Sequence, residues 1–524
     1  MRMPGVLSHI HTRRGPFAAF AFAVFVFLAA YKVAMYIVSG ETANLIYIGM
    51  TVVVLAIVVA ILNNWRNGLY LFLGWLLFED LARKYLGNNM AIYFGKDFLV
   101  AVVYIAFIAA IRRKEVQTFR PRFLLPLVVF IWFGVLQVFN PASTNLAIGA
   151  LGLKLYFYYV PLVFIGYALL DSEKDLRRFF IVNMVLAVVI CGLGIVQSIL
   201  GHSFLNPATP PEDLKELSTL YRLAPISRVL VYRPTSVFVS DGRFASYAVM
   251  AWILTVGFVG FLLLRSRRGR TFAYLALAII SVGIVMSGSR GAFVWMGLSL
   301  LICGVAFLCG APWRQGKALR VVHALQRTLV VGGLALLLLL ALYPEALTSR
   351  LAFYSETLSL DSPANELTYR ARDYPMQNFL LAFEYARWPY GYGIGTASLG
   401  MQYMARILKI KSPVAGVENG YGSLIVELGI LGLVLWIVWT VALVLASWKV
   451  VKRLRGSPWF PLAFAVAWFA FLLLFPLTYG GIVQYQHYVL NAYLWLLVGI
   501  LFRLPYIAQS ALNAATEQAA VGTR

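Results

Sequence analysis

Residues 420–447 read GYGSLIVELGILGLVLWIVWTVALVLAS, and the basic stretch WKVVKRLRG follows at 448–456. An apolar run of this length can cross a bilayer, because a helical span needs roughly 20 residues. Lys and Arg residues that directly follow a span are typical of a cytoplasmic loop. The stretch therefore predicts a transmembrane helix that ends at the cytoplasmic face.

The same pattern recurs along the whole chain. Of its 524 residues, 61% are hydrophobic and 12% are charged, whereas soluble domains are about 45–50% apolar and about 25% charged. We therefore predict an all-α, polytopic fold with about 12–14 transmembrane helices in a single membrane domain, residues 1–524. The predicted spans are 17–38, 44–62, 68–82, 92–111, 123–139, 153–170, 178–200, 244–264, 271–287, 292–310, 328–343, 420–447, 459–478 and 488–503.

The positions of the basic residues give these spans an orientation. If Arg13 and Arg14 are cytoplasmic, every second loop is cytoplasmic too, and those loops hold 21 of the 44 Lys and Arg residues. The short outer loops 140–152 and 478–488 contain none. This distribution follows the positive-inside rule and places both termini in the cytoplasm. It also explains the net charge of +23 without a nucleic-acid partner.

Two of the outer loops are long, at about residues 201–243 and 343–419. Both contain patterns that favour amphipathic helices, which can lie on the outer leaflet or cover a cavity. In the first loop a helix start at 209–213 is followed by Leu214, Leu217 and Tyr221. In the second loop a one-face stripe follows Pro375 and consists of Met376, Phe379, Leu380 and Phe383.

Arg290 lies in the turn Ser287-Gly288-Ser289-Arg290-Gly291 between two predicted spans, on the outer side. An arginine at the end of a span usually anchors the helix by reaching toward the headgroups. Short outer turns normally avoid arginine, however, and this one is surrounded by small residues. A permanently charged planar fork in such a setting suits a phosphate or diphosphate ligand.

The long outer loops supply further arginines and one notable acid. Candidate anion ligands are Arg233 in the first loop and Arg370 and Arg372 in the second, whereas Arg222, Arg228 and Arg243 fit loop packing equally well. Glu418 directly precedes the span that begins at residue 420. It is either an acid at a helix N-terminus or a partly desolvated carboxylate that acts as a general base.

Other polar features have structural interpretations at least as good as functional ones. The run Gly391-x-Gly393-x-Gly395 favours a turn over a phosphate-binding backbone, because no strand precedes it. The charged residues predicted inside spans need partners or a role in the site; they are Lys32, Lys96, Asp97, Lys154 and Glu427. No His, Cys or acidic cluster has the spacing of a metal site, so no metal and no cofactor is predicted.

Several of these motifs together resemble the O-antigen ligase and O-antigen polymerase superfamily over about residues 120–450. They are Asn140-Pro141 with Gly152 and Lys154, Arg233-Pro-Thr-Ser-Val-Phe238, Ser-Gly-Ser-Arg290-Gly, Pro389-Tyr-Gly-Tyr-Gly-Ile-Gly395, and Glu418-Asn-Gly-Tyr-Gly422 with the span behind it. The order of the motifs and the matching topology carry the resemblance more than any single motif does.

The resemblance implies an enzyme of the bacterial inner membrane that transfers a glycan from a polyprenyl-diphosphate carrier at the periplasmic face. The acceptor would be a glycan or a lipid, and partners from polysaccharide assembly remain open. Arg290 and Arg370 or Arg372 match the arginines that would hold the diphosphate. Ligases of the family commonly have a His at the position of Glu418, and its absence favours a polymerase of O-antigen or exopolysaccharide.

Three other functions remain open from the sequence. One is the ligase, which passes the glycan to the lipid A core. Another is a transporter of lipid-linked glycans, although the chain shows neither the internal repeat nor the midplane polar sites that transporters usually have. The third is a scaffold for polysaccharide assembly.

Overall fold

The structure is a computed structural model, and it describes residues 35, 42–87, 89–211, 214, 217, 220–265, 268–312, 315–359, 366–399, 401–410 and 416–522. Within these ranges the chain forms two compact units: residues 1–75 with 94–116, and residues 76–93 with 117–524. Each is described by itself. Lys32, Arg13, Arg14 and all of the predicted span 17–38 except residue 35 lie outside the described residues, as do residues 212 and 213 of the helix start at 209–213.

The first unit contains the helix α2, much of α3 and most of α4. Their bounds are α2 Thr42–Asn63, α3 Trp65–Tyr85 and α4 Met90–Arg112, so α3 and α4 each have one end in the second unit. The rings of Trp65 and Phe107 lie 5.1 Å apart and join α3 to α4. Lys96 and Asp97 of α4 are both buried, and both have interaction partners.

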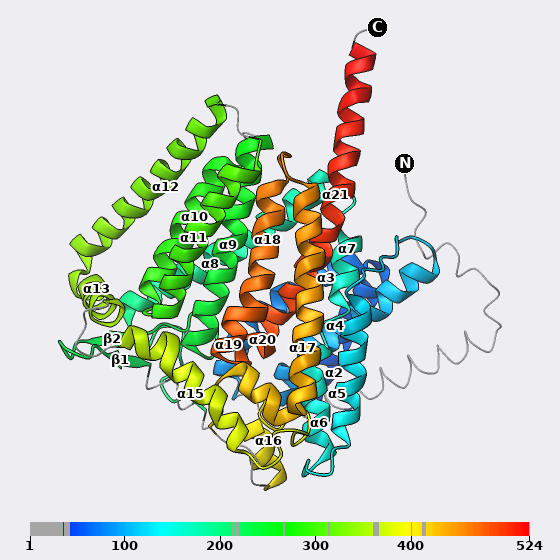
Figure 1. The fold of residues 1–524 in the computed structure, drawn as a ribbon, viewed down its shortest axis with the longest axis vertical. Coiled ribbons are helices and arrows are strands. Elements are labelled where there is room, and N and C mark those ends of the chain that lie inside the picture. The colour runs from blue at the N-terminus through cyan, green and yellow to red at the C-terminus, as the bar shows by residue number, and fades with distance from the viewer. Residues whose placement is uncertain are drawn as a thin grey trace. The chain divides into compact units, whose positions relative to one another are not determined.

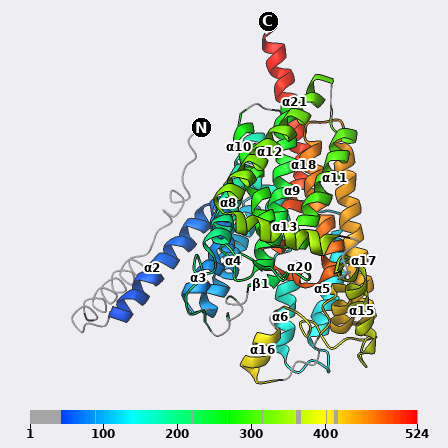
Figure 2. The same cartoon turned by 90° about the vertical axis from the view of Figure 1, so that its left-hand side faces the viewer.

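The second unit is a bundle of long helices that is closed at one end by short elements (Figures 1 and 2). Its longer helices are α5 Leu124–Val138, α6 Leu146–Phe157, α7 Leu162–Leu169, α8 Glu173–Leu200, α9 Asp241–Arg265, α10 Arg270–Met286, α11 Arg290–Gly310, α12 Gln315–Leu342, α17 Gly420–Arg453, α18 Phe460–Leu472 and α21 Tyr488–Gly522. The shorter elements are β1 Tyr221–Leu223, β2 Leu230–Tyr232, α13 Pro344–Leu358, α14 Glu366–Thr368, η3 Tyr369–Asp373, α15 Tyr374–Leu381, η4 Ala382–Glu384, α16 Met401–Leu408, η5 Leu473–Leu477, α19 Thr478–Gly480 and α20 Val483–Gln486.

These elements confirm the all-α, polytopic class. Apart from the first, every predicted span lies on a helix, or on two helices in immediate succession. Eight helices in the described part are long and apolar enough to cross a membrane, and a ninth is added if α12 and α13 form one bent span. Other predicted spans fall on the shorter apolar helices 47–63, 124–138 and 270–286, or on α3, which carries charges at its end. The two-stranded hairpin of β1 and β2 was not predicted.

Close helix packing in the core depends on glycines. At Gly166 of α7 an added Cβ would lie 2.1 Å from the carbonyl oxygen of Leu496 in α21, and at Gly499 it would lie 2.1 Å from that of Val163. Such small residues let two helix backbones approach each other where hydrophobic driving force between helices is weak. Nearly the whole length of α9 is buried against its neighbours, so this helix forms the centre of the unit.

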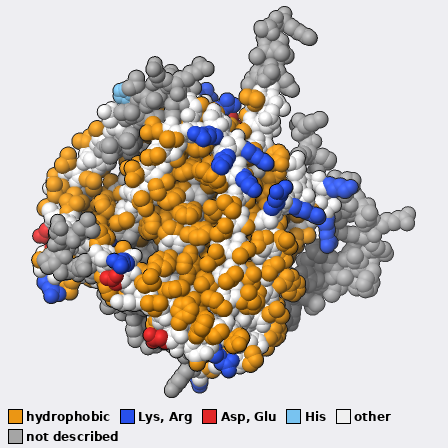
Figure 3. Space-filling model, in the orientation of Figure 1, with side chains coloured by type: hydrophobic (Ala, Val, Ile, Leu, Met, Phe, Trp, Pro, Cys, Tyr) orange, Lys and Arg blue, Asp and Glu red, His pale blue; other side chains and the backbone are white. Residues whose placement is uncertain are grey.

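The two ends of the bundle differ in their polar residues. At one end, Arg265 pairs with Glu173 at 3.2 Å, and Gly456 donates from its N–H to the carbonyl oxygen of Gly310 at 2.8 Å. We call this the basic end, because α17 finishes there on Lys452 and Arg453. Figure 3 shows Lys and Arg side chains gathered along one edge of a broad hydrophobic surface. Loops that the sequence assigned to one side of the membrane therefore meet at one end.

The opposite end holds the two long loops, residues 201–243 and 343–419, and we call it the loop end. The predicted helix after Pro375 is confirmed by α15, although Met376 and Leu380 on its predicted apolar stripe are exposed. In the first loop Leu214 and Leu217 are buried, but the helical pattern does not reach Tyr221. Tyr221 instead begins strand β1, because its partner Tyr232 offers a ladder of backbone hydrogen bonds.

Candidate functional site

The site at the loop end begins with the turn between α10 and α11. Ser289 caps α11 by accepting a hydrogen bond from the N–H of Ala292, and Arg290 is the first residue of that helix. Gly288 has a φ of +64°, a conformation that glycine adopts without strain. A Cβ there would lie 3.3 Å from Cγ of Arg233, so the glycine lets the first long loop pack directly against the turn.

Arg233 and Arg222 come from that first long loop. Arg233 forms an ion pair with Asp241 at 2.6 Å. Burial lowers the pKa of the Arg233 guanidinium, Asp241 opposes this effect, and the charges of Arg222 and Arg290 add to it. The Nε of Arg233 is buried and has no hydrogen-bond partner within the described part of the chain. A buried donor without a partner is costly, and an anionic ligand beside it would remove that cost.

Arg370 comes from the second long loop and lies on the π-helical turn η3. Its guanidinium lies 4.9 Å from the ring centre of Tyr374 and 5.9 Å from that of Tyr369. Arg372, two residues further, has an 84% exposed side chain that is paired at 4.0 Å with Asp373. Of these two arginines only Arg370 faces the site, a choice that the sequence left open. Single π-turns of this kind recur at functional sites.

Arg222, Arg233, Arg290 and Arg370 line a single cavity of about 300 Å³. Its other lining residues are Gly288, Ser289, Gly291 and Phe353. We call it the four-arginine cavity. The guanidinium of Arg290 lies 5.4 Å from the ring centre of Phe353, which forms part of the wall. Four like charges around one small space repel one another, so the arrangement is complementary to a ligand with several negative charges. Forked guanidinium groups suit phosphate oxygens in particular.

A second cavity of about 520 Å³ shares Arg290, Gly291 and Arg370 with the first. Away from these residues its wall is mainly apolar, and it runs along α11. The apolar lining comes from α11 and from the segments on either side of it: Val294, Trp295, Leu298, Leu358, Leu367, Pro375, Pro476, Leu477 and Tyr479. We call it the apolar cavity. Together the two cavities offer a polyanion site and a hydrocarbon site with arginines at their junction.

Glu418 lies outside the lining of both cavities but is joined to it. The hydroxyl of Tyr374 donates a hydrogen bond to the Glu418 carboxylate, and the ring of Tyr374 carries Arg370. The bond to Glu418 raises the pKa of the Tyr374 hydroxyl, so this hydroxyl remains protonated as the donor. The predicted desolvation of Glu418 is not found, because its side chain is exposed. The cap of α17 is Asn419, which accepts from the N–H groups of Tyr421 and Gly422.

Residues 275–437 match the family model described as O-antigen ligase. The match covers this segment of the chain, which is similar to the O-antigen ligase and polymerase superfamily. No match was found among the curated proteins. The matched segment contains Arg290, Arg370 and Glu418, whereas Arg222 and Arg233 lie before it.

Within the O-antigen ligase segment, the glycine run at 391–395 has a packing role. Gly391, Gly393 and Gly395 have φ values between 81° and 103°. The N–H of Gly393 donates to the carbonyl oxygen of Glu427 at 2.9 Å, at a break in α17 where Gly429 has a φ of 73°. The turn interpretation thus fits the structure better than phosphate binding.

The charged residues Glu427 and Lys154 also have partners. The buried carboxylate of Glu427 accepts hydrogen bonds from the Tyr156 hydroxyl at 2.8 Å, the Ser398 hydroxyl at 2.6 Å and the Ala397 N–H at 2.8 Å. The ammonium of Lys154 lies 4.4 Å from the ring centre of Tyr93. Glu427 therefore holds the second long loop against α17 and α6, and Lys154 joins α6 to the start of α4.

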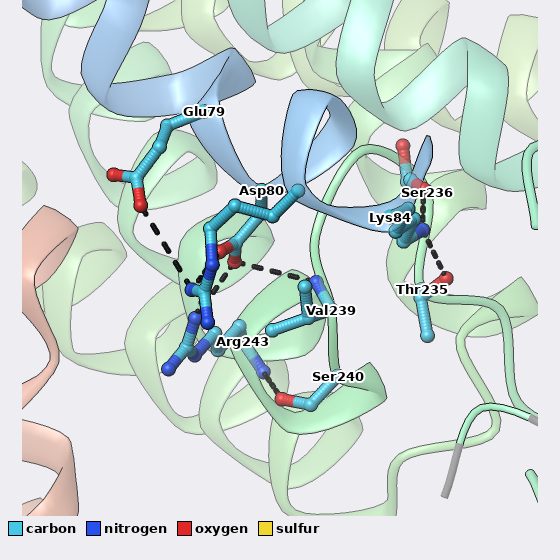
Figure 4. Close-up of polar contacts among 9 residues, drawn as sticks. Glu79, Asp80, Lys84, Thr235, Ser236, Val239, Ser240 and Arg243 are labelled. Carbon is cyan, nitrogen blue, oxygen red and sulfur yellow. Dashed lines mark hydrogen bonds and ion pairs between the residues drawn. The ribbon is translucent and has the colours of Figure 1, made fainter. Parts of the chain in front are cut away.

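A second group of charges supports the first long loop from behind (Figure 4). Asp80 accepts two hydrogen bonds from Arg243, at 2.7 and 3.1 Å, and one from Arg83 at 2.9 Å. The Lys84 ammonium donates to the Thr235 hydroxyl at 2.8 Å and to the carbonyl oxygen of Ser236 at 2.7 Å. We call this group the Asp80 cluster. It holds the chain just after Arg233, at Thr235 and Ser236, and again at Arg243. Arg243 consequently has a packing role.

Arg222 and Arg350 are the site residues that sequence reasoning did not select. Arg222 was a candidate for loop packing, and the other residues that line its cavity, such as Arg290 and Arg370, are distant in sequence. Arg350 is buried and donates to the carbonyl oxygens of Met286 at 2.9 Å, Tyr232 at 2.8 Å and Ala346. It thereby ties α13 to the residues just before Ser287 and Arg233. Neither role has a local signal in the sequence.

Proposed function

We propose that this protein is a glycan polymerase that joins glycan units from a polyprenyl-diphosphate-linked donor. The observation that carries the proposal is the junction of the four-arginine cavity with the apolar cavity. A donor of this class has two negatively charged phosphates directly attached to a long hydrocarbon chain, and the two cavities match these parts in the same order. The residues assigned to the diphosphate are Arg233, Arg290 and Arg370, with Arg222 added from the structure.

The arginines have a direct role in the proposed reaction. The bond between C1 of the donor sugar and a phosphate oxygen breaks, while the acceptor hydroxyl oxygen bonds to C1. The departing diphosphate gains negative charge, which fixed guanidinium groups stabilise. The diphosphate leaves as an anion, so this side of the reaction needs no proton donor. The donor is already activated, so the proposed reaction uses no ATP, and the arginines take the place of a metal ion in stabilising the leaving diphosphate.

Glu418 is the proposed general base for the acceptor. It would receive the proton that the acceptor hydroxyl loses, with the Tyr374 hydroxyl between it and the cavity wall. An exposed carboxylate beside the cavity mouth remains within reach of an acceptor that enters from the aqueous side. Arg370 would hold the donor on the other side of the same tyrosine ring.

The cell location follows from the same proposal. We place the loop end at the periplasmic face of the bacterial inner membrane, and the basic end with the C-terminus in the cytoplasm. The support is the charge distribution, because the basic end gathers the Lys and Arg residues of the short loops. The N-terminus is assigned to the cytoplasm from its sequence alone.

The test is glycan length in a deletion strain that carries the wild-type gene, Arg290→Ala, Glu418→Gln or Arg372→Ala. We expect single carrier-linked units after deletion, and long polymer with wild type and Arg372→Ala only. Arg372→Ala is the matched control because that side chain points away from the cavities. Immunoblots of membrane fractions check that every variant is present.

The same strains separate the competing functions. Long polymer that stays on the carrier and never reaches the lipid A core would identify a ligase. Absence of polymer after deletion, with the carrier-linked units held on the cytoplasmic side, would favour a transporter. Normal polymer with loss of partner recruitment would favour a scaffold. Each of these three results would overturn the polymerase proposal.

A further inference from the structure

The hairpin formed by β1 and β2 has two different faces. Its antiparallel register pairs Arg222 with Val231, and Leu223 with Leu230. Side chains alternate along a strand, and paired residues share a face. Arg222 and Val231 therefore share one face, where Arg222 lines the four-arginine cavity with an exposed side chain and Val231 is fully buried. On the opposite face, which we call the outward face, Tyr221, Leu223 and Leu230 are exposed, whereas Tyr232 is buried against the bundle.

The outward face and the turn of the hairpin are apolar and exposed. Tyr221, Leu223, Ile226 and Leu230 expose 45%, 54%, 55% and 58% of their surface. Residues 221–232 contain no acid, and their charged side chains are Arg222 and Arg228. A contiguous group of large apolar side chains that is exposed on a soluble surface usually marks an interaction site.

The turn is held in place rather than left loose. The carboxylate of Glu356 in α13 accepts from the N–H of Ile226 at 2.8 Å and from that of Ser227 at 3.1 Å. Inside the turn the N–H of Ala224 donates to the carbonyl oxygen of Val229 at 2.9 Å. Buried Val231 packs with Phe353 and Tyr354 of α13. The apolar tip is thus presented by a fixed scaffold.

The position of the hairpin indicates what covers this face. It packs on α13, which turns away from α12 by 116°. Figure 1 shows β1 and β2 beside α13, at the side of the bundle and at the level where α12 ends. The last residues of α12 are also apolar and exposed, with Leu342 at 62%. The outward face of the hairpin therefore continues the apolar surface of a membrane-spanning bundle.

We propose that the hairpin 221–232 inserts its outward face into the lipid leaflet that adjoins the loop end. Tyr221, Leu223, Ile226 and Leu230 would contact acyl chains just below the headgroups, and Arg228 would lie among the headgroup phosphates. Amphipathic segments with Tyr, Leu and Arg bind at this boundary in the same way. The lipid contact does not depend on the proposed function.

A consequence for the site does rest on the proposed function. Arg222 and the lipid-facing residues lie on opposite faces of one short hairpin. This hairpin would therefore be the wall that separates the four-arginine cavity from the leaflet. The lipid-linked donor would then reach the arginines sideways from the membrane, without leaving the hydrocarbon phase. Detachment of the hairpin should lower donor use while the aqueous side of the site stays intact.

The experiment measures how deeply single side chains lie in the bilayer. An environment-sensitive fluorophore is attached to single cysteines in the full chain, purified and reconstituted into lipid vesicles. Cys309 is exposed and is first replaced by Ser, whereas Cys191 and Cys303 are buried. The test position is Ile226→Cys. Ser355→Cys on the exposed side of α13 is the aqueous control, and Leu301→Cys on the surface of α11 is the lipid control. Quenchers are lipids with a nitroxide near the headgroup and, separately, aqueous iodide.

We expect lipid quenching at Ile226 at least about twofold stronger than at Ser355, as for a side chain at the interface, and weak iodide quenching. Strong iodide quenching with little lipid quenching would overturn the proposal and leave a solvated hairpin. Protection from both quenchers, together with a concentration-dependent dimer, would overturn it in favour of contact between two copies of the chain.

A second variant links lipid contact to the site. Leu230→Asp should abolish lipid quenching at Ile226 and lower polymer formation, whereas Leu230→Met should change neither. If Leu230→Asp removes the lipid contact while polymer formation is unchanged, the sideways route for the donor is wrong and the proposed function stands. If no variant or wild type forms polymer, the proposed function fails while the depth measurement still decides the lipid contact.

Discussion

The four-arginine cavity and the Asp80 cluster both contact the first long loop, residues 201–243. The two groups differ in how the charges of their arginines are neutralised. In the Asp80 cluster, Arg243 and Arg83 share a fully buried carboxylate, so the guanidinium groups are paired inside the protein. In the cavity, Arg233 pairs with Asp241, and four guanidinium groups surround one space. A buried charge needs a partner to be tolerated. The Asp80 cluster thus gathers two guanidinium groups around a carboxylate of the protein, whereas the cavity gathers four around a space that suits a ligand anion.

The largest expected effect is on Arg290. Arg290→Ala should abolish polymer formation, because one fixed charge at the junction of the two cavities is lost. The thermal unfolding midpoint in detergent should stay equal or rise, since the variant relieves repulsion among four guanidinium groups. Polymer is measured in the complemented deletion strain and unfolding by fluorescence-detected size exclusion. A fully active variant would remove Arg290 from the site.

Glu418→Gln tests the proton transfer. We expect a rate lower by about 10²–10⁴-fold, the usual contribution of a general base, with donor binding unchanged. Tyr374→Phe should have a smaller effect of the same kind, because it removes only the hydroxyl that joins Glu418 to the cavity wall. Initial rates with a purified lipid-linked donor give both values. A Glu418→Gln enzyme with the wild-type rate would leave the carboxylate as a feature of the helix start.

Asp80→Asn tests whether the Asp80 cluster stabilises the folded protein. Removal of this buried carboxylate charge deprives Arg243 of its ion pair, leaves Arg83 its longer contact with Glu79 at 3.8 Å, and should cost about 3–5 kcal/mol of folding free energy. The measurement is again thermal unfolding in detergent. Asp373→Asn is the control, because Asp373 pairs with the exposed Arg372 and such a pair contributes about 0–1 kcal/mol. Equal stability of the two variants would contradict the role given to the Asp80 cluster.

The smallest expected effect is an increase in folding stability when a ligand binds. Inorganic diphosphate should stabilise wild type, by about 2.7 kcal/mol at 100 times its Kd, because it binds only the folded cavity. Arg290→Ala should lose this shift, and Arg372→Ala should keep it. A shift of equal size in Arg290→Ala would mean that diphosphate binds elsewhere.

The lengths and limits of most helices were predictable, because an apolar run and its flanking charges are local features. The end of α17 at Lys452 and Arg453 is an example. Arg290 could also be selected from the sequence as a candidate anion ligand, because an arginine in a short outer turn departs from the expected charge distribution. Hairpin β1–β2 was not, because its residues are too few for a pattern and their pairing depends on α13.

The sequence by itself determined that this chain is a helical membrane protein with arginines near one end of its bundle, and its motifs resemble the O-antigen ligase and polymerase superfamily. Those properties depend on composition and on short motifs. Only the tertiary structure decided that Arg222, Arg233, Arg290 and Arg370 share one cavity, that Arg372 faces away and that Glu418 is exposed. The direction of a loop side chain depends on contacts with residues that are distant in sequence, and no local pattern records them.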